Sequence, residues 1–294
     1  LIAHKFEVRE ATIQKIENLM SRLVLPMLGQ TPIEKLNITS LTEWKNKISA
    51  EALSIRYKQN IYSTFRAVLN FGVKMEYISR NPLCLVGNFK DPNFEKPQDK
   101  IHYYTPEQFN AFITEARKNC KDLTDWGYYV FFNIAFYTGL RKGEINALKW
   151  TDIEGDIIHV RRSVAQKVKG KPIVETPPKN KSSYRDVQMP LKLRLILEQH
   201  HARHRAQKRY TDEYRVCGGV SCLSDTSISN RNNQFATAAG LEPIRIHDFR
   251  HSHASVLVNN GINIQEVARR LGHSKVEMTW NTYAHLYPHE EEKA

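Results

Sequence analysis

The spacing of apolar residues constrains the fold of this chain more than any other feature of its sequence. In most segments apolar residues recur every three or four positions, which is the period of one helix face. Between Ile157 and Met189 the period changes to two, and residues 158–162, 173–176 and 185–189 are expected to be strands. The sequence therefore predicts an α+β fold, mainly α with a small three-stranded antiparallel β-sheet.

A polar segment divides the chain into two parts. At 294 residues the chain is longer than one ordinary core usually holds, so two domains are expected. Residues 89–100 contain Pro92, Pro97 and three lysines, a composition typical of an exposed linker. We therefore expect an all-helical domain over residues 1–88 and a mixed domain with a C-terminal tail over residues 101–294.

The first domain is expected to contain three helices. Apolar spacing predicts a helix over residues 12–28 that bends or ends at Pro26. Thr39 and Ser54 are suited to cap a second and a third helix. The third helix carries basic residues opposite its apolar stripe, facing either solvent or phosphate groups: Arg56, Lys58, Arg66 and Lys74.

Capping residues mark the helices of the second domain. Thr105, Pro106 and Gln108 have the pattern of a capping box with proline at the first helical position. The helix that begins there is expected to extend to about Asn119. A second helix over residues 125–138 is apolar nearly all round and stops at Gly139, so we expect it to lie in the core. Further helices are expected over residues 191–209, 228–239, 247–259 and 264–271.

The charge of the chain points to a polyanionic partner. There are 43 Lys and Arg against 31 Asp and Glu, which gives a net charge of +12 and a pI near 9.5. Residues 159–215 hold 15 basic and 5 acidic residues, so this region carries most of the excess. Nucleic acid is the expected partner. The basic face of the third helix is one candidate DNA-binding surface. Further candidate DNA contacts lie outside that helix, at Lys167, Lys169, Lys181 and Arg203.

Two classes of protein are disfavoured by the sequence. No stretch approaches the roughly 20 apolar residues that a membrane span needs, and the start lacks the order of a secretory signal. The four cysteines form no close pair, so neither a disulfide framework nor a zinc ribbon is expected. These features favour a cytoplasmic protein. Because the first residue is Leu1, we also expect the natural chain to begin earlier.

Arg141 lies where a helix ends and another begins. It follows the helix-stopping Gly139 and precedes an apolar stretch through Leu148 and Trp150. A cation at a helix N-terminus is unfavourable unless an anion such as phosphate joins the two. Arg141 is therefore either a phosphate ligand or an exposed arginine in a turn.

A second cationic group is expected on the helix that begins at His247. The spacing of three places His247 and Arg250 on one face, with His251 one turn from His247. That face is suited to hold an anion. A metal site is disfavoured, because no carboxylate or cysteine completes the set and Arg250 would repel the ion. His200, His201 and His204 also resemble ligands, but their basic neighbours favour a DNA-facing helix.

His273 and Tyr283 complete an ordered set of residues. Leu271, Gly272 and His273 end a helix, and Tyr283 follows ten residues after His273. A single tyrosine is usually a packing residue. The order of Arg141, a basic hairpin, His-x-x-Arg, Leu-Gly-His and tyrosine is what points to chemistry.

These segments resemble the catalytic domain of the tyrosine recombinase (phage integrase) family over residues 101–290. The resemblance is carried by TGLRKGEI at 138–145, HDFRHSHAS at 247–255 and LGHS at 271–274, followed by NTYAH. The helical block before residue 90 is similar to the family's core-binding domain. In style the chain is similar to integrases of conjugative transposons and temperate phages.

The resemblance implies a role for each residue that matches a family position. Arg141 and Arg250 match the arginines that hold the phosphate oxygens, and Tyr283 matches the nucleophile. His247 is a candidate proton acceptor, and His273 matches the residue that packs against the phosphate and hydrogen-bonds it. The lysine that protonates the leaving 5′ oxygen is expected at Lys179, with Lys181 as the alternative.

The resemblance also implies cofactors and partners. Exchange of one phosphodiester for another requires neither ATP nor a metal ion, and no Walker-type loop is present. The implied activity is integration and excision of a mobile element in the bacterial cytoplasm. Double-stranded DNA is the implied partner, with four protomers on two DNA sites and an accessory bending or excision factor. A type IB topoisomerase and a non-catalytic DNA-binding regulator are the rival functions.

Overall fold

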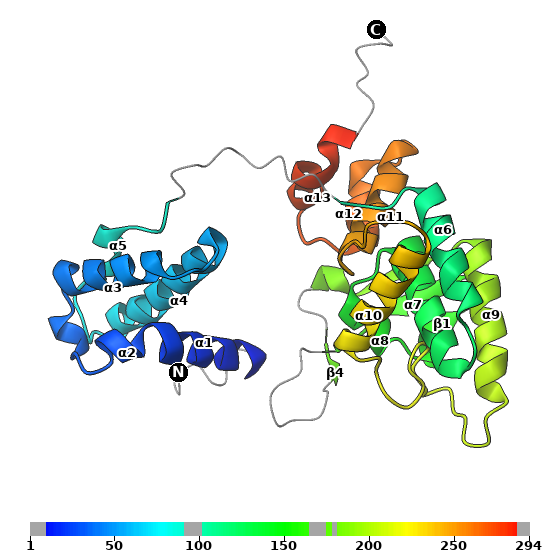
Figure 1. Ribbon diagram of the computed structural model, residues 1–294, viewed down its shortest axis with the longest axis horizontal. Helices are drawn as coiled ribbons and strands as arrows, with labels where there is room; N and C mark the ends of the chain where they lie inside the picture. Colours follow the sequence, from blue (N-terminus) through cyan, green and yellow to red (C-terminus); the bar gives the residue numbers. More distant parts are fainter. Residues whose placement is uncertain (1–9, 91–101, 165–174, 178–180, 287–294) are drawn as a thin grey trace, which may run out of the picture. The chain divides into compact units, whose positions relative to one another are not determined.

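The computed structural model describes residues 10–90, 102–164, 175–177 and 181–286, which form two compact units (Figure 1). One unit is built from residues 10–90 and the other from the remaining described ranges. Most of the expected linker lies outside the described residues, as do Lys167, Lys169 and Lys179. Both units are mainly helical, and small antiparallel sheets occur in the second, which confirms the predicted fold class.

The N-terminal unit is a group of helices around an aromatic core. Trp44 and Phe65 are buried with ring centroids 5.1 Å apart, and the Trp44 indole donates a hydrogen bond of 2.8 Å to the Leu23 carbonyl. The burial of these rings holds the helices together. The helices are α1 (Glu10–Leu23), α2 (Leu25–Leu28), α3 (Ile38–Ala50), α4 (Ile55–Lys74) and α5 (Leu83–Val86), with the 3-10 turn η2 (Ile33–Lys35).

Of the two helix caps predicted in this unit, Ser54 is confirmed and Thr39 is not. The Ser54 side chain accepts from the Tyr57 amide and begins α4, as predicted. The prediction of Thr39 as a cap is wrong, because the N-cap of α3 is Asn37, two residues earlier. Asn37 and Ser40 exchange reciprocal side-chain hydrogen bonds with each other's backbone amides, which gives this end of α3 a more complete cap.

The C-terminal unit is organised around α7 (Leu123–Thr138). This helix is buried on nearly every side, and Phe131, Phe132 and Ile134 have no exposed surface. It packs against α6 (Pro106–Lys118), α9 (Leu191–Arg205) and α11 (Asp248–Asn259) (Figure 1). α7 is therefore the core helix that the sequence predicted. The remaining helices are α8 (Lys142–Ala147), α10 (Asp225–Ala238), α12 (Ile264–Leu271) and α13 (Val276–Tyr283), with the 3-10 turns η3 (Trp150–Asp152), η4 (Lys181–Ser183) and η5 (Ala284–Leu286).

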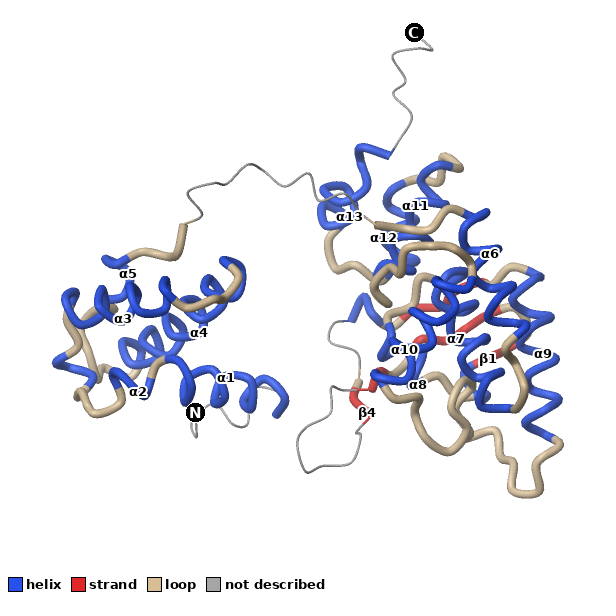
Figure 2. Tube along the Cα trace, in the orientation of Figure 1, coloured by secondary structure: helices blue, strands red, loops and turns tan. Residues whose placement is uncertain are grey.

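The sheet differs from the prediction in one of its strands. β2 (Ile157–Val160) pairs in antiparallel fashion with β5 (Arg185–Gln188) on one edge and with β1 (Ile153–Glu154) on the other. Figure 2 shows the strands in red. Of the expected strand 173–176, the structure describes residues 175–176, and these do not pair with this sheet. Instead β4 (Glu175–Thr176) pairs with β3 (Ser163–Val164) in a separate ribbon.

Two glycines end helices next to the candidate site. Gly139 after α7 and Gly272 after α12 have φ values of 65° and 68°, which glycine adopts without the cost that a Cβ imposes. A Cβ on Gly139 would lie 2.7 Å from the His253 ring. Each glycine therefore permits both a helix end and a close approach of backbone to its neighbours. Within the described residues, every helix is too short or too polar to cross a bilayer.

Candidate active site

Arg141 lies at the N-cap of α8 and is held by Glu144. Its backbone amide donates to Glu144 Oε2 at 2.9 Å, and its Nη1 forms an ion pair with Glu144 Oε1 at 2.9 Å. The Arg141 side chain is 36% exposed, whereas that of Glu144 is 4% exposed. The anion expected at this helix N-terminus is therefore supplied in part by the chain itself. The exposed part of the guanidinium remains open to a ligand.

Glu144 is also paired with Arg185, a residue that the sequence analysis did not single out. Arg185 Nη2 and Nη1 lie 2.9 and 3.3 Å from the two carboxylate oxygens, and both side chains are 4% exposed. Burial raises the pKa of Glu144, but hydrogen bonding and the charges of Arg185 and Arg141 together hold that pKa below its usual value. Glu144 is therefore a buried carboxylate that orients two arginines.

Arg250 is buried on α11 with its guanidinium aimed at two backbone carbonyls. Nη1 donates to the Gly139 carbonyl at 2.8 Å and Nη2 to the Leu271 carbonyl at 2.6 Å. Burial and the nearby Arg141 lower the pKa of Arg250 to about 9, so it remains charged at neutral pH. A buried arginine with backbone partners has a fixed orientation.

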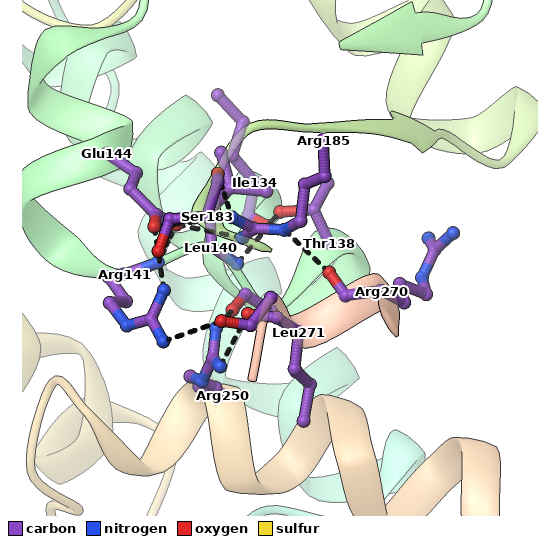
Figure 3. A network of polar contacts seen from close by, with 12 residues as sticks. Ile134, Thr138, Leu140, Arg141, Glu144, Ser183, Arg185, Arg250, Arg270 and Leu271 are labelled. Carbon is purple, nitrogen blue, oxygen red and sulfur yellow. Dashed lines mark hydrogen bonds and ion pairs between the residues drawn. The ribbon is translucent and has the colours of Figure 1, made fainter. Parts of the chain in front are cut away.

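The C-terminal end of α12 brings the arginines together (Figure 3). Arg185, Arg250 and Arg141 donate to three consecutive carbonyls, those of Arg270, Leu271 and Gly272, at 2.8, 2.6 and 3.3 Å. The last carbonyls of a helix lack intrahelical donors and carry the negative end of its dipole, so cations are stabilised there. The helix end is therefore a scaffold that holds three guanidinium groups close to one another.

His273 and His247 lie beside these arginines and are uncharged at neutral pH. His273 Nδ1 forms a hydrogen bond of 2.7 Å with the hydroxyl of the buried Thr279. Burial lowers the pKa of His273 to about 4, and Arg250 and Arg141 contribute. Burial, with His251 and Arg250, also lowers the pKa of His247 to about 4. Both rings are therefore suited to hydrogen bonding with an anion that enters between the cations.

Tyr283 ends α13 and is 2% exposed within a small apolar cluster. Its hydroxyl forms a hydrogen bond of 2.6 Å with Nδ1 of His251. Burial raises the pKa of Tyr283 well above its usual range, and the charge of Arg250 opposes the rise. The hydroxyl is therefore protonated and paired with His251, whereas the sequence analysis named His247 as the candidate acceptor.

His253 belongs to the scaffold of the site. The side chain is buried, its Nδ1–H donates to the Phe136 carbonyl at 2.8 Å and its Nε2 accepts from Arg270 Nε at 3.0 Å. Both ring nitrogens are therefore used. This neutral tautomer ties α11 to α12 and to the end of α7.

The prediction that the histidines of α9 face DNA is wrong for two of them. His200 and His204 are 0% and 2% exposed, because this side of α9 packs on the core. His200 Nε2 donates to the Val216 carbonyl, and His204 Nδ1 accepts from the Trp150 indole. His201 stacks on Trp150 with ring centroids 4.1 Å apart.

The predicted DNA contacts are distributed over both units. Arg56, Arg66 and Lys74 are exposed on α4, while Lys58 donates to the Ser49 carbonyl at 2.7 Å. On α9, the Arg203 guanidinium lies 3.8 Å from the centroid of the Trp126 ring. Lys181 is in η4, and its side chain is outside the described residues.

Among the described residues, no three His, Cys, Asp or Glu side chains are grouped so as to hold a metal ion. The residues that the structure brings to one place are Arg141, Arg250, His247, His273 and Tyr283. Four residues that were not among the predicted site residues lie at the same place: Glu144, Arg185, His251 and His253. A mainly helical unit with this combination of arginines, histidines and a tyrosine defines the class of tyrosine-type recombinases.

Comparisons with known proteins agree with this class. The model of the phage integrase family matches residues 102–290, and the chain belongs to this family. It is a tyrosine-type site-specific recombinase of the kind found in conjugative transposons and phages.

Two curated relatives cover most of the chain. The ICEBs1 integrase of Bacillus subtilis (strain 168) is 29% identical over 277 residues, which are 90% of this chain and 71% of that protein. The putative prophage phiRv2 integrase of Mycobacterium tuberculosis is 24% identical and covers 91% of this chain and 68% of its own.

Two solved structures share the fold. The Tn1549 transposon integrase, in complex with a circular intermediate DNA, has a TM-score of 0.77 at 20% identity and covers 98% of this chain and 92% of its own. A lambda integrase dimer bound to a core site has a TM-score of 0.67 at 15% identity and covers 95% and 90%. At these identities the likeness supports the fold alone.

Proposed function

We propose that this chain cuts and rejoins DNA strands through a 3′-phosphotyrosyl intermediate formed on Tyr283, in the integration and excision of a mobile element. The observation that carries the proposal is the convergence of Arg141, Arg250, His273 and Tyr283 around the end of α12. A phosphodiester placed there would meet two guanidinium groups, and a phenol lies beside Arg250.

The chemistry follows from the charges of these groups. The Tyr283 oxygen forms a bond to phosphorus while the bond to the 5′ oxygen breaks, so one phosphodiester replaces another and no nucleotide is consumed. Arg141 and Arg250 would neutralise the extra charge of the pentacoordinate state, a role for which a metal ion is otherwise used. His247 and His273 would hydrogen-bond the phosphate oxygens.

The leaving 5′ oxygen needs a proton. We assign this role to Lys179, with Lys181 as the alternative, because a lysine ammonium in the basic hairpin has a proton to donate. Lys179 lies outside the described residues. The two lysines can be separated by substituting each one with methionine and measuring cleavage.

The proposal extends to the partners and domains of the chain. Residues 1–88 would bind the core of the DNA site through the exposed cations of α4, residues 89–100 would link, and residues 101–294 would carry the chemistry. The Tn1549 and lambda relatives are described as DNA complexes, which supports duplex DNA as the partner. We further propose a cytoplasmic, nucleoid-associated tetramer on two DNA sites, assisted by a bending or excision factor. Binding should weaken steeply with salt because it releases counterions.

The test is to trap and map the covalent intermediate. The probe is a nicked duplex that spans the joined ends of the mobile element carrying the gene. The native chain is expected to become attached to the 3′ phosphate, and peptide mass mapping should find the DNA on Tyr283. Tyr283→Phe should bind the duplex and form no adduct. An adduct on another tyrosine, or none with the native chain, would refute the proposal. Recombinant products from two sites would exclude a topoisomerase.

A further inference from the structure

Within the described residues, the hydroxyl of Tyr283 forms a hydrogen bond with His251, which lies outside the set of site residues predicted from the sequence. His251 Nδ1 lies 2.6 Å from the Tyr283 oxygen, which is within the range for transfer of the phenolic proton. His247, the N-cap of α11, lies one helical turn before His251, and the centroids of the two rings are 5.2 Å apart. The two histidines therefore stand in different places relative to the nucleophile.

We propose that His251 is the base that takes the proton from Tyr283 when the phenol attacks the phosphodiester, and that His247 serves the phosphate instead. The inference rests on the proposed function. As the bond between the Tyr283 oxygen and phosphorus forms, the phenolic proton moves to His251 Nδ1, and the ring becomes an imidazolium. The electrons of the broken bond remain on the 5′ oxygen, which is protonated by the lysine acid. In the rejoining step His251 returns its proton to the departing Tyr283.

The surroundings of His251 keep it available as a base. Burial lowers the pKa of His251, and Arg245 and Arg250 lower it further against the opposing charge of Asp248. The Asp248 carboxylate is engaged by the backbone amide and guanidinium of Arg245, at 2.9 to 3.1 Å. His251 is therefore neutral near pH 7, and in the tautomer that carries its proton on Nε2 it accepts a hydrogen bond from the phenol.

The elements packed around His251 add few other charges. α11 contributes His247, Asp248 and Arg250, and α13 contributes Tyr283 itself. His285 of η5 is exposed. Among the described residues, His251 is the histidine in hydrogen-bond contact with the phenol, and His247, the N-cap of α11, lies beside it.

A proton acceptor in contact with Tyr283 is needed because a protonated phenol is a weak nucleophile. Burial raises the pKa of Tyr283, so the fraction of phenolate at neutral pH is negligible without an acceptor. Arg250 stabilises the phenolate but is bound to two carbonyls and takes no proton. A hydrogen-bonded neutral imidazole supplies the acceptor that the arginines cannot.

The experiment compares matched substitutions of the two histidines. Native protein, His251→Asn, His251→Ala and His247→Asn are mixed with the nicked duplex of joined element ends. The rate of adduct formation is measured from about pH 5 to about pH 9. Asparagine keeps a hydrogen-bonding atom near the position of Nδ1 but has no basicity, so it separates holding the phenol from taking its proton. Duplex binding and thermal unfolding of each variant show that it is folded.

The native rate should rise with pH and level off above the pKa of His251, which burial lowers from its usual value. His251→Asn should be slower by about 10²-fold or more at neutral pH, and its rate should climb roughly tenfold per pH unit without levelling, because hydroxide must then remove the proton. His247→Asn should be slower than native but keep the level region.

Other outcomes overturn the inference. If His251→Asn cuts at nearly the native rate, or more slowly with the native pH profile, His251 only holds Tyr283 in place. If His247→Asn is the variant that loses the level region, His247 is the base. A native adduct combined with either result leaves the proposed function intact, whereas a native chain without any adduct overturns both.

Discussion

At the scale of single residues, the buried pair of Arg185 and Glu144 fixes the position of Arg141. Both side chains are 4% exposed, and Glu144 also holds the backbone and side chain of Arg141. Removing one member of a buried pair leaves the other charge uncompensated, which costs more than the pair contributes when intact. The role of Arg185 is therefore to keep Glu144 ionised and in place.

Arg185→Ala should destabilise the protein and slow adduct formation together. We expect the free energy of unfolding to fall by about 3–5 kcal/mol, because Glu144 keeps only the partly exposed Arg141 as a partner. The measurement is urea unfolding, with Lys118→Ala as the control. Lys118 pairs with Glu115 at the surface, so its loss should cost about 1 kcal/mol or less. Equal losses for the two variants would contradict the role given to Arg185.

The sequence could identify single residues of the site but not their pairing. Arg141, His247, Arg250, His273 and Tyr283 were named because they occur in an ordered set of motifs. Which histidine meets Tyr283 depends on where α13 packs against α11, and residue spacing does not contain that information. Arg185 left a usable signal, since the period of two puts it on the same side of β5 as the buried Val187.

At the scale of elements, helix ends determine the site geometry. The carbonyl of Gly139 at the end of α7 and the last carbonyls of α12 are the groups that orient the arginines. Both ends require a glycine with positive φ. A change at either glycine should therefore affect stability and catalysis together.

Gly139→Ala tests this coupling. The new Cβ would meet the His253 ring at 2.7 Å and a Leu271 methyl at 2.9 Å, in addition to the cost of φ +65°. Gly261→Ala is the matched control, because its φ is +73° and no atom lies within 4 Å of the added Cβ. We expect the control to lose about 1 kcal/mol and Gly139→Ala to lose a further 1–3 kcal/mol, roughly, in urea unfolding. Adduct formation should fall for Gly139→Ala alone.

Helix ends were predicted well where a single residue marks them. Strands were predicted less well, because their place in a sheet depends on which segments pair. Thr105 and Gly139 mark helix ends by their own backbone chemistry, and α6 and α7 begin or end there. The described part of the predicted strand 173–176, Glu175–Thr176, was assigned to the wrong sheet. A period of two shows which residues alternate in a strand but not which strands pair. The short turn between β1 and β2 pairs these two strands, and β5 occupies the other edge of β2, so β2 has no free edge for another strand.

At the scale of the whole molecule, buried neutral histidines make the fold sensitive to acid. His200 and His253 are 0% and 5% exposed, and burial lowers the pKa of each to about 3. His200 was not foreseen as buried, because a histidine among basic residues looks like a surface group in sequence. Their hydrogen bonds to Val216 and Phe136 connect α9 and α11 to distant segments of the C-terminal unit.

The sign of the pH effect follows from the lowered pKa values. In the unfolded chain these histidines take up protons as the pH falls through about 6.5, whereas in the folded chain they remain neutral until about pH 3. The unfolded state therefore binds more protons in this interval, and stability is lost as the pH decreases. Well below pH 6.5, each of the two histidines should remove about 1.4 kcal/mol per pH unit from the free energy of unfolding.

Urea unfolding of the whole chain at several pH values between about 7 and about 5 measures this loss. His253→Gln and His200→Gln keep a polar side chain but bind no proton, so each should make the pH dependence shallower while lowering stability at pH 7. His285→Gln, at an exposed position, should leave the slope as it is in the native chain. A native stability that is constant over this range would mean that the buried histidines titrate alike in the folded and unfolded states. Their burial would then have no part in the acid response.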